Sequence, residues 1–419
     1  MDALRLANTA LAVDILKKFF EKSKTDNIIF SPLCVSTSLA LALKGSKENT
    51  AAEFIKVLHV EKVKDCDFGF QSLNSDIAKI SSIYSIKLIK RLYIEKSLNC
   101  TKNFVDSTKK PYPSELEEID INSQPEEARN QINTSIKELT DGKFETSLNE
   151  GTCDENTKIL LVGAAHFKAN WLYKFNETET KEMDFHINKR AFLAYMAERE
   201  YFTIPWTSTG FRLSWCRFTF FTASVFFFKT ETKPVQMMHL EARLSIGYIN
   251  DLETTILEIP CTGKQISLLL LLPKCIEDDS TGLKKLEEDI TFEKYVHWTN
   301  PSMMANSKVK LCLPKFKMEC SYVLNDTLKS LGLNDAFNEE ASDFSGMSES
   351  KGIVLSQAIQ NACIEIDEEG TETADVTKER LLMHKDEFVV DHPFLFIVRH
   401  NKSRTVLMCG RYCSPPSTC

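Results

Sequence analysis

The run Lys158-Ile-Leu-Leu-Val-Gly-Ala-Ala-His-Phe-Lys-Ala-Asn-Trp171 decides the fold class of this chain. Its first half is continuously apolar, which is typical of a strand covered on both faces rather than on one. The run therefore predicts a long buried strand over residues 158–171. Apolar residues before this run recur mainly at helical spacing, whereas those after it occur mainly in strand-like runs.

Helices are predicted before this strand. Apolar residues recur at helical spacing near the N-terminus, and Pro32 and Gly45 bracket a second helix over 33–43, since Pro suits the first turn and Gly the end. A third helix is predicted over 126–140, with acidic residues at its start and Gly142 after it. The stripes that predict the first and third helices are Ala7, Leu11, Ile15 and Phe19, then Ala128, Ile132, Ile136 and Leu139.

Strands are predicted after it. Their ranges are 266–272, 309–318, 394–398 and 405–408, and a turn at 401–403 joins the last two. A helical half followed by a strand-rich half, without a βαβ rhythm, indicates a mixed α and β (α+β) fold.

Composition excludes some classes of function. The formal net charge of -8 argues against a general nucleic-acid binder, whose affinity rests on clustered basic residues. The 13 cysteines form no CxxC pair and no zinc-type spacing, which favours reduced, buried thiols in the cytosol. A labile thiol or disulfide among Cys409, Cys413 and Cys419 is the alternative. No basic region precedes an apolar run at the N-terminus, so we expect no secretory leader.

Residues 190–229 differ from the rest of the chain. They contain 13 aromatic residues, nine of them Phe. The apolar run over 218–228 is too short for a bilayer span, which needs about 20 residues. Our hypothesis is a translated intron or mispredicted exon, because Phe codons are T-rich like the tract before a splice acceptor. A lineage-specific loop and a membrane-touching loop are the alternatives.

No enzyme motif is present: the sequence has no GxSxG, HExxH, Walker loop or GxGxxG. Asp391-His392 and Ser414 suggest a triad only by their residue types, and we predict that His392 is structural. We therefore expect no catalytic residues, no enzyme activity and no cofactor.

Two charged clusters have simpler interpretations than ligand binding. The acidic run Glu365, Asp367, Glu368 and Glu369 lacks EF-hand spacing, so we predict the solvated start of a loop and no metal site. Lys87, Lys90 and Arg91 would suit a polyanion, but a solvated face is favoured.

Several segments together resemble the serpin family. The resemblance runs over residues 1–415, apart from the aromatic insert, and it implies a single domain over 1–419. That domain would have a large central sheet, smaller sheets, a helical N-terminal half and an exposed reactive loop at 368–390. The main matching segments are Asn27-Ile-Ile-Phe-Ser-Pro32, Ala165-His-Phe-Lys-Ala-Asn-Trp171, Glu368-Glu-Gly-Thr-Glu372 and Asp391-His-Pro-Phe394.

The expected lack of a leader resembles clade B, the ovalbumin-like branch of the family. Phe68-Gly-Phe-Gln71 and Thr232-Lys-Pro-Val-Gln-Met-Met238 are similar to a non-inhibitory member of that branch. The resemblance places the insert between two strands of a small sheet near the reactive-loop end.

In inhibitory serpins the cut reactive loop enters the main sheet as an added strand. The resemblance identifies Arg380-Leu381 as the bait, although counting from the hinge places the cut near His384-Lys385. Gly370 lies 23 residues before Pro393, which is shorter than the inhibitory pattern. The implied hinge comprises Glu368, Glu369, Gly370, Thr371, Glu372, Thr373, Ala374, Asp375, Val376 and Thr377.

Alternate hinge residues share one strand face, which turns inward on insertion by the family pattern. Asp375 and Glu379 lie on that face. Even when protonated, each buried carboxyl needs a partner or costs about 1–3 kcal/mol. The loop is therefore predicted to be a poor trap.

The implied sheet-opening region comprises Ser31, Gly163, His166 and Gln360. The family pattern has Asn and His at the positions of Gly163 and Gln360, so an Asn–His hydrogen bond is missing. His166 stands where the family has Tyr, and the sequence leaves open whether it compensates.

The resemblance implies a non-inhibitory serpin that restrains epithelial cell growth, migration and invasion. Its expected partners are proteins, among them extracellular-matrix or cell-surface components, and serine proteases that cut the loop. Residues 380–383 are read either as an interaction site or as a solvated tether. The rival functions are a trypsin-like serine-protease inhibitor with Arg380 as bait, and a chaperone or storage serpin. We expect a monomer without nucleic acid or membrane span, in the cytoplasm and exported without a leader.

Overall fold

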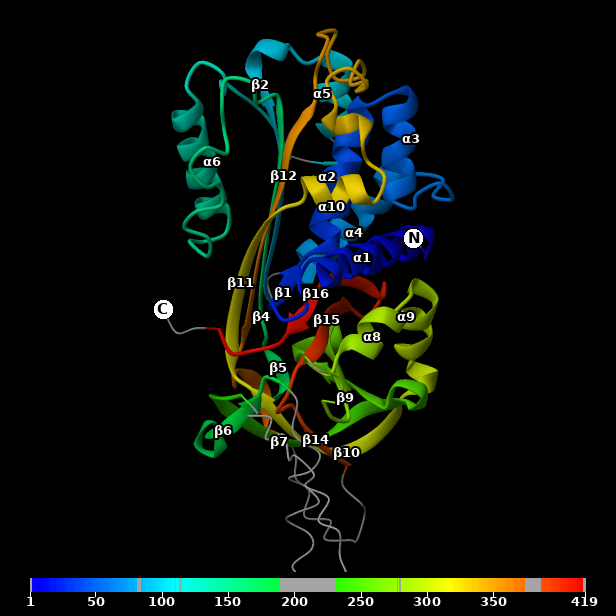
Figure 1. Cartoon of the computed structure of the whole chain (residues 1–419), viewed down its shortest axis with the longest axis vertical. Helices are drawn as coiled ribbons and strands as arrows, with labels where there is room; N and C mark the ends of the chain where they lie inside the picture. Colours follow the sequence, from blue (N-terminus) through cyan, green and yellow to red (C-terminus); the bar gives the residue numbers. More distant parts are fainter. Residues whose placement is uncertain are drawn as a thin grey trace, which may run out of the picture.

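The main sheet lies between two helical layers. The computed structural model describes residues 2–80, 84–109, 111–112, 115–188, 231–276, 278, 280–373 and 386–416. Within them, five strands pair in the order β11-β12-β4-β2-β3. Helix α6 covers one face and the other N-terminal helices cover the opposite face (Figure 1). The strands are β2 (Ser85–Glu95), β3 (Leu116–Ile119), β4 (Ile159–Lys168), β11 (Phe316–Val323) and β12 (Leu355–Ile366).

The helical half agrees with the predicted periodicity. The stripe predicted for the first helix is buried, and Ser31 caps α2 by accepting a hydrogen bond from the Cys34 amide at 3.2 Å. Pro125 starts α6, and Gly142 follows it with φ of 76°. The helices are α1 (Asp2–Lys22), α2 (Pro32–Gly45), α3 (Glu48–Val57), α4 (Cys66–Ile80), α5 (Lys102–Lys109) and α6 (Pro125–Leu139).

A second sheet forms the other end of the molecule. Its order is β1-β16-β15-β9-β8-β7-β10-β14, with β6 also paired to β7. The late pair is confirmed, because β15 and β16 run antiparallel around a turn at 401–404. The strands are β1 (Ile28–Phe30), β6 (Lys181–His186), β7 (Thr232–Ile249), β8 (Thr254–Pro260), β9 (Ile266–Pro273), β10 (Ala305–Pro314), β14 (Asp386–Val389), β15 (Phe394–His400) and β16 (Thr405–Tyr412). Helices α8 (Lys284–Asp289) and α9 (Phe292–Trp298) lie beside it, and α10 (Asn325–Ser330) precedes β12.

Two predicted strands are each divided between sheets, so those predictions are wrong in extent. The stretch 158–171 becomes β4 and then β5 (Trp171–Lys174), which pairs in parallel with β13 (Gly370–Thr373). The Ala169 amide still donates to Glu365 O, whereas the Trp171 amide donates to Glu369 O, beyond the end of β12. Similarly, 309–318 divides at Lys315 into β10 and β11. The hydrophobic pattern cannot show a change of pairing partner.

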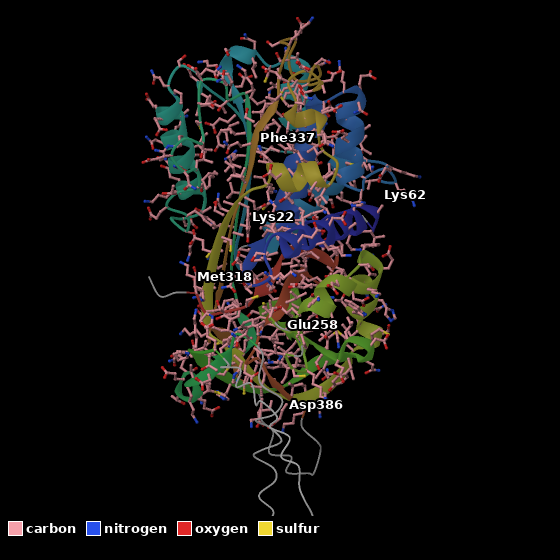
Figure 2. All side chains as sticks on the ribbon, viewed as in Figure 1. Lys22, Lys62, Glu258, Met318, Phe337 and Asp386 are labelled. Atoms are coloured by element: carbon pink, nitrogen blue, oxygen red, sulfur yellow. The ribbon has the colours of Figure 1, made fainter. Side chains whose placement is uncertain are left out.

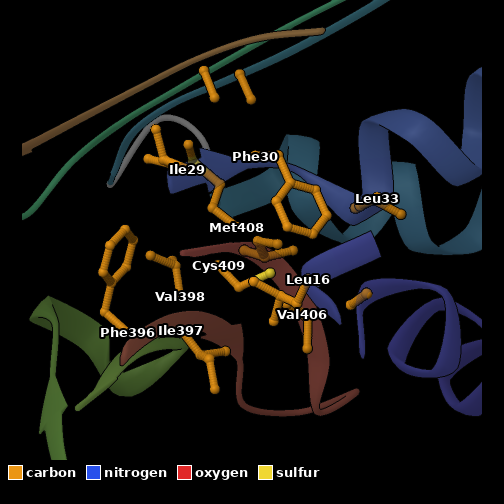
Figure 3. Close-up of a cluster of buried hydrophobic side chains, with 14 of the residues drawn as sticks. Leu16, Ile29, Phe30, Leu33, Phe396, Ile397, Val398, Val406, Met408 and Cys409 are labelled. Carbon is orange, nitrogen blue, oxygen red and sulfur yellow. The ribbon is translucent and has the colours of Figure 1, made fainter. Parts of the chain in front are cut away.

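The core has two parts, one on each side of the main sheet. Every residue of β4 from Ile159 to Phe167 is buried, as predicted for a strand covered on both faces. Side chains fill the layers throughout (Figure 2). Under the junction of the two sheets, Ile29, Phe30 and Leu33 meet Phe396 and Met408 (Figure 3). A smaller cluster joins Leu160 and Val162 to Ile132 and Ile136 of α6.

The ends of the aromatic insert come together. The insert itself lies outside the described residues, but β6 and β7 flank it and pair antiparallel up to His186 and Thr232. The Ile187 amide donates to Glu231 O at 2.9 Å, and the Glu231 amide donates to Asn188 Oδ1 at 2.9 Å. The chain therefore leaves and re-enters the fold at one point. Among the described helices, none is long and apolar enough to cross a membrane.

Candidate functional site

The predicted hinge begins where β12 ends, and its backbone is held against β5. The Trp171 indole donates to Asp367 O at 2.7 Å, and the Phe175 amide donates to Glu368 O at 3.2 Å. Gly370 pairs with Trp171, and a Cβ on Gly370 would lie 2.7 Å from Lys174 Cα. Only glycine permits so close an approach. The hinge therefore turns away from the main sheet instead of continuing along it.

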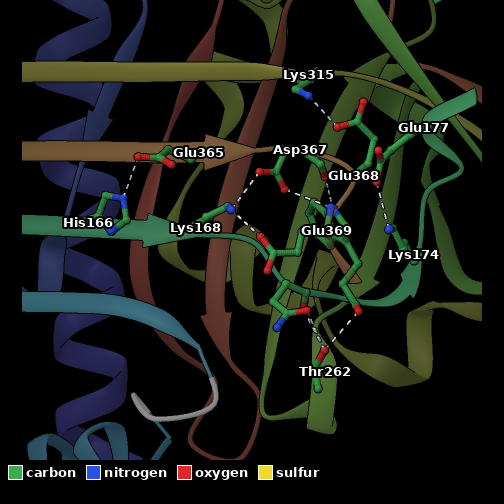
Figure 4. A network of polar contacts seen from close by, with 12 residues as sticks. His166, Lys168, Lys174, Glu177, Thr262, Lys315, Glu365, Asp367, Glu368 and Glu369 are labelled. Carbon is green, nitrogen blue, oxygen red and sulfur yellow. Dashed lines mark hydrogen bonds and ion pairs between the residues drawn. The ribbon is translucent and has the colours of Figure 1, made fainter. Parts of the chain in front are cut away.

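The acidic side chains at the start of the hinge are paired with cations (Figure 4). Lys315 Nζ lies 2.7 Å from Glu368 Oε2, and the Thr180 hydroxyl donates to Glu368 Oε1 at 2.9 Å. Lys168 donates to Glu369 and lies 3.2 Å from Asp367 Oδ2. The prediction of a solvated loop start is wrong for Glu368, whose side chain is only 9% exposed. We call Lys168, Lys315, Asp367, Glu368 and Glu369 the hinge clamp.

Electrostatics favour the charged forms within the hinge clamp. Burial would raise the pKa of Glu368, but the hydrogen bonds from Lys315, the backbone and Thr180 outweigh it and hold this pKa below its usual value. The hydrogen bond to Glu369 raises the pKa of Lys168, against the opposing effect of burial. Both ion pairs are therefore present at neutral pH.

The seam between β12, which leads into the hinge, and β4 is closed. Strands β12 and β4 run parallel and pair directly, from Leu355 with Ile159 to Glu365 with Lys168. Gln360 pairs with Gly163, and its side chain is buried beside α2 in a small pocket that Val35, Ser38 and Leu39 also line. The two positions that the family pattern links are thus neighbours, although Gly163 offers no side chain for a hydrogen bond.

His166 does not compensate for the missing bond. Side chains alternate along a strand, and Gly163 and His166 lie on opposite faces of β4. His166 instead pairs with Cys363 in the register, and its Nε2 lies 3.1 Å from Glu365 Oε1. Ser31 does not take part in the Gly163–Gln360 contact either, because its hydroxyl donates to Leu407 O of β16 at 2.6 Å. The four residues predicted to form one sheet-opening region therefore serve three different contacts.

Much of the predicted loop lies outside the described residues. These are Ala374, Asp375, Val376, Thr377, Glu379, Arg380 and Leu381, together with the side chains of Glu372 and Thr373. Of the remaining hinge residues, Thr371 meets Thr262 with 2.9 Å between the two hydroxyl oxygens. The inward face and the bait therefore stay predictions.

His392 is structural, as predicted. Its Nε2 lies 2.7 Å from Pro273 O and its Nδ1 lies 2.7 Å from Asp391 Oδ1. Ser414 takes part in a different contact, in which its backbone amide donates to Asn27 Oδ1 at 3.1 Å. Among the described residues, Asp391, His392 and Ser414 thus form no triad.

The prediction of a solvated face is wrong for Lys90, which lies at the centre of the basic cluster. Lys90 is 8% exposed and lies 3.2 Å from Glu115 Oε1, and it also donates to Asn74 Oδ1 at 2.9 Å. Lys87 pairs with Asp141 at 2.7 Å. Since Lys87 and Lys90 have carboxylate partners, the cluster offers little charge to a polyanion.

None of the described cysteines forms a disulfide bond, and most are buried or half-buried. Cys409 and Cys413 are both buried thiols, which agrees with the preferred prediction, whereas Cys419 lies outside the described residues. Cys275 is the exposed exception among those described.

Sequence reasoning missed the cations of the hinge clamp. Lys168 lies inside the segment 165–171, which carried the resemblance to the serpins, and Lys315 lies inside the predicted strand 309–318. The available signal was the acidic run itself, since carboxylates next to a buried strand need partners. Which lysines supply them depends on how β4, β10 and β12 meet.

A family model described as "Serpin (serine protease inhibitor)" matches residues 6–214 and 221–415. The chain belongs to the serpin family. Serpin B5 of Xenopus laevis is 65% identical to this serpin over 415 residues, which are 99% of this chain and 98% of the relative. The crystal structure of maspin matches with a TM-score of 0.87 and 46% identity, over 99% of both chains.

A structure described as that of a tumour suppressing serpin matches with a TM-score of 0.84 and 46% identity, over 99% of this chain and 100% of the other. The stretches 68–71 and 232–238 that resembled one clade B serpin are therefore part of a similarity to maspin that extends along the whole chain. The predicted α+β serpin fold is likewise confirmed.

Proposed function

We propose that this serpin acts by binding proteins or extracellular-matrix components, without trapping proteases, and that it restrains epithelial cell growth, migration and invasion. Its similarity to Serpin B5, to maspin and to a tumour suppressing serpin supports this function. Binding rather than catalysis is part of the proposal. The stretch 380–383, with one cation among three apolar residues, is the proposed contact surface.

The observation that carries the proposal is burial on both sides of the closed seam. From Ile159 to Phe167 every residue of β4 is buried, and β12 is largely buried beside it. A loop strand placed between them would therefore be covered on both faces along most of its length. Its charged residues would be buried whichever face they occupied.

The loop sequence fits that environment poorly. Insertion replaces the β4–β12 hydrogen bonds with bonds to the new strand, so the backbone does not oppose it. The side chains do, because Asp375 and Glu379 would both enter the sheet. At about 1–3 kcal/mol for each unsatisfied group, the two together remove about 2–6 kcal/mol from the driving force. The hinge clamp adds ion pairs that insertion must break.

A protease assay tests the non-inhibitory part of the proposal. The protein is mixed with trypsin and run on a denaturing gel, and mass spectrometry separates cleavage after Arg380 from cleavage after Lys378 or Lys385. We expect simple cleavage and no covalent complex. An Arg380→Ala variant is the matched control, because it loses only that cleavage. A complex with trypsin that survives denaturation contradicts the proposal and supports the rival inhibitor with Arg380 as bait.

A cell assay tests the binding part. Purified protein is added to migrating epithelial cells on matrix-coated filters, and we expect fewer cells to cross. The matched control replaces 380–383 with Gly and Ser at equal length, which should abolish the effect while leaving the melting temperature unchanged. If this variant slows migration as strongly as the unaltered protein, the contact surface lies outside the loop.

The proposal includes a monomer that works in the cytoplasm and also reaches the extracellular space. The described cysteines form no disulfide and are largely buried, which fits a reducing compartment. Cell fractionation and assay of the culture medium test the location, and light scattering tests the oligomeric state. Protein confined to the secretory pathway would contradict this part.

A further inference from the structure

Three side chains with metal-ligating atoms meet across the seam of the main sheet. His166 comes from β4, while Cys363 and Glu365 come from β12, and their ligand atoms all lie within 4.8 Å of one another. His166 and Cys363 are register partners, and Glu365 follows two residues later on the same face. This is the only such group of three among the described residues.

The donor set suits one class of ion. An imidazole nitrogen, a thiolate and a carboxylate are the usual protein ligands of Zn²⁺. The separation of 3.1 Å between His166 Nε2 and Glu365 Oε1 is close to the roughly 3.3 Å that tetrahedral Zn²⁺ imposes on nitrogen and oxygen ligands. Bringing in the Cys363 sulfur needs a movement on the order of 1 Å or less, within reach of a side-chain rotation.

Two of the three groups lie inside the sheet. His166 is 0% exposed, and its Nε2 is the ring nitrogen that faces Glu365. Its Nδ1, on the other side of the ring, has no hydrogen-bond partner and is not one of the proposed ligand atoms. Cys363 is also fully buried and forms no disulfide. The Glu365 side chain is 20% exposed, so the site reaches solvent on that side, from which an ion can enter.

Two cations oppose metal binding. Lys143 Nζ lies 3.3 Å and Lys317 Nζ 3.7 Å from Glu365 Oε1. Their side chains are 35% and 59% exposed, so both can turn toward water when an ion enters. They would lower the affinity without blocking the site. Removing their charges should therefore strengthen binding.

We propose that His166, Cys363 and Glu365 bind one Zn²⁺ ion, which joins β4 to β12 across the seam. Cys363 loses its proton to solvent as the ion binds. Because the folded state alone holds the three ligands together, Zn²⁺ stabilises it by RT ln(1 + [Zn²⁺]/Kd), which rises with the concentration of the free ion. The site is independent of the proposed cellular function, and either can fail without the other.

Cobalt substitution tests the site. The metal-free, reduced full-length protein is titrated with Co²⁺, and we expect a thiolate-to-cobalt charge-transfer band and tetrahedral d–d bands that saturate at one ion per chain. Added Zn²⁺ should abolish these bands. The variants Cys363→Ser and His166→Gln should lose them, Glu365→Gln should weaken binding at least tenfold, and the double variant Lys143→Gln/Lys317→Gln should strengthen it.

The controls separate this site from adventitious thiol binding. Cys153→Ser removes a buried thiol of the same core cluster, and Cys275→Ser removes the exposed one, so both should retain the bands. Thermal melts check that each variant is folded. If a variant fails to fold, zinc absorption spectroscopy of the unaltered protein still decides, since it must show one sulfur ligand with the rest nitrogen or oxygen. Absence of stoichiometric binding, or an unchanged band in Cys363→Ser, overturns the proposal.

Discussion

The side chain of Gln360 covers the space that a Cβ on Gly163 would enter: the amide oxygen of Gln360 would lie 3.3 Å from that Cβ. The two residues are register partners on β12 and β4, on the face of the sheet that packs against α2. They occupy the positions that the family pattern gives to a hydrogen-bonded Asn and His. Here the bond is replaced by packing of an amide over a glycine.

This packing predicts strong coupling between the two positions. Gly163→Asn alone should destabilise the fold, because its side chain meets Gln360, whereas Gly163→Asn with Gln360→His should recover stability. We expect a coupling free energy of about 0.5–3 kcal/mol in a double-mutant cycle. Urea unfolding of the four proteins measures it. Additive effects would show that the two side chains act independently.

The hinge clamp predicts a response to acid. The pKa of Glu368 is lowered in the folded protein, so its contribution is present above the unfolded pKa of about 4.3 and is lost as pH falls through the lower folded pKa. The protection factor of the Phe175 amide, which donates to Glu368 O, should fall below about pH 4, after correction for the slower intrinsic exchange in acid. In the Glu368→Gln variant, the Phe175 amide should exchange faster at neutral pH, and its protection should depend less on acid. An identical pH profile in this variant would assign the effect to another group.

Loop charges predict how the cut protein behaves. We expect trypsin-cut protein to melt near the temperature of the intact protein, because the loop stays outside the sheet. The double variant Asp375→Ala/Glu379→Ala removes the two acidic side chains and should raise the melting temperature of the cut form. Differential scanning calorimetry measures both forms. A large rise already present in the unaltered protein after cleavage would contradict our interpretation of the loop.

Substitution of the buried Arg411 is expected to cause a large loss of stability. Arg411 is 0% exposed, lies 2.6 Å from Glu287 Oε1, and donates to Asp26 O at 2.9 Å. Arg411→Met leaves a buried carboxylate and backbone acceptors without partners, so we expect a loss of about 3–5 kcal/mol in the free energy of unfolding. Lysine should rescue only part of it, since it cannot reproduce the forked geometry. A loss below about 1 kcal/mol in the free energy of unfolding would indicate that water, rather than Arg411, satisfies these groups.

Deleting the aromatic insert is expected to leave the fold intact. Because Ile187 and Glu231 are already hydrogen-bonded, removing 190–229 would leave β6 and β7 joined by a tight turn. We expect the shortened protein to fold with an unchanged or higher melting temperature and to aggregate less. Transcript sequencing tests the origin of the segment: messages that lack these codons support the intron or mispredicted-exon hypothesis, and messages that always contain them reject it.

Local patterns predicted the elements well where one face or both faces of an element are simply buried. The stripe through Leu11 and Ile15, the cap at Ser31 and the apolar run before Gly163 all describe short-range physics. The same patterns failed at 169–170 and at Lys315, where the chain changes sheets without a change in hydrophobicity. They also misjudged Glu368 and Lys90, whose partners lie far away in the sequence.

The sequence by itself determined the fold class and the family, because apolar periodicity, capping residues and motif order are written along the chain. Only the tertiary structure decided which lysines hold Glu368 and Glu369, that His166 faces away from Gln360, and that it meets Cys363 and Glu365. Those relationships depend on the parallel register of β12 with β4. One residue of slip in that register would exchange the two faces, and no local pattern records it.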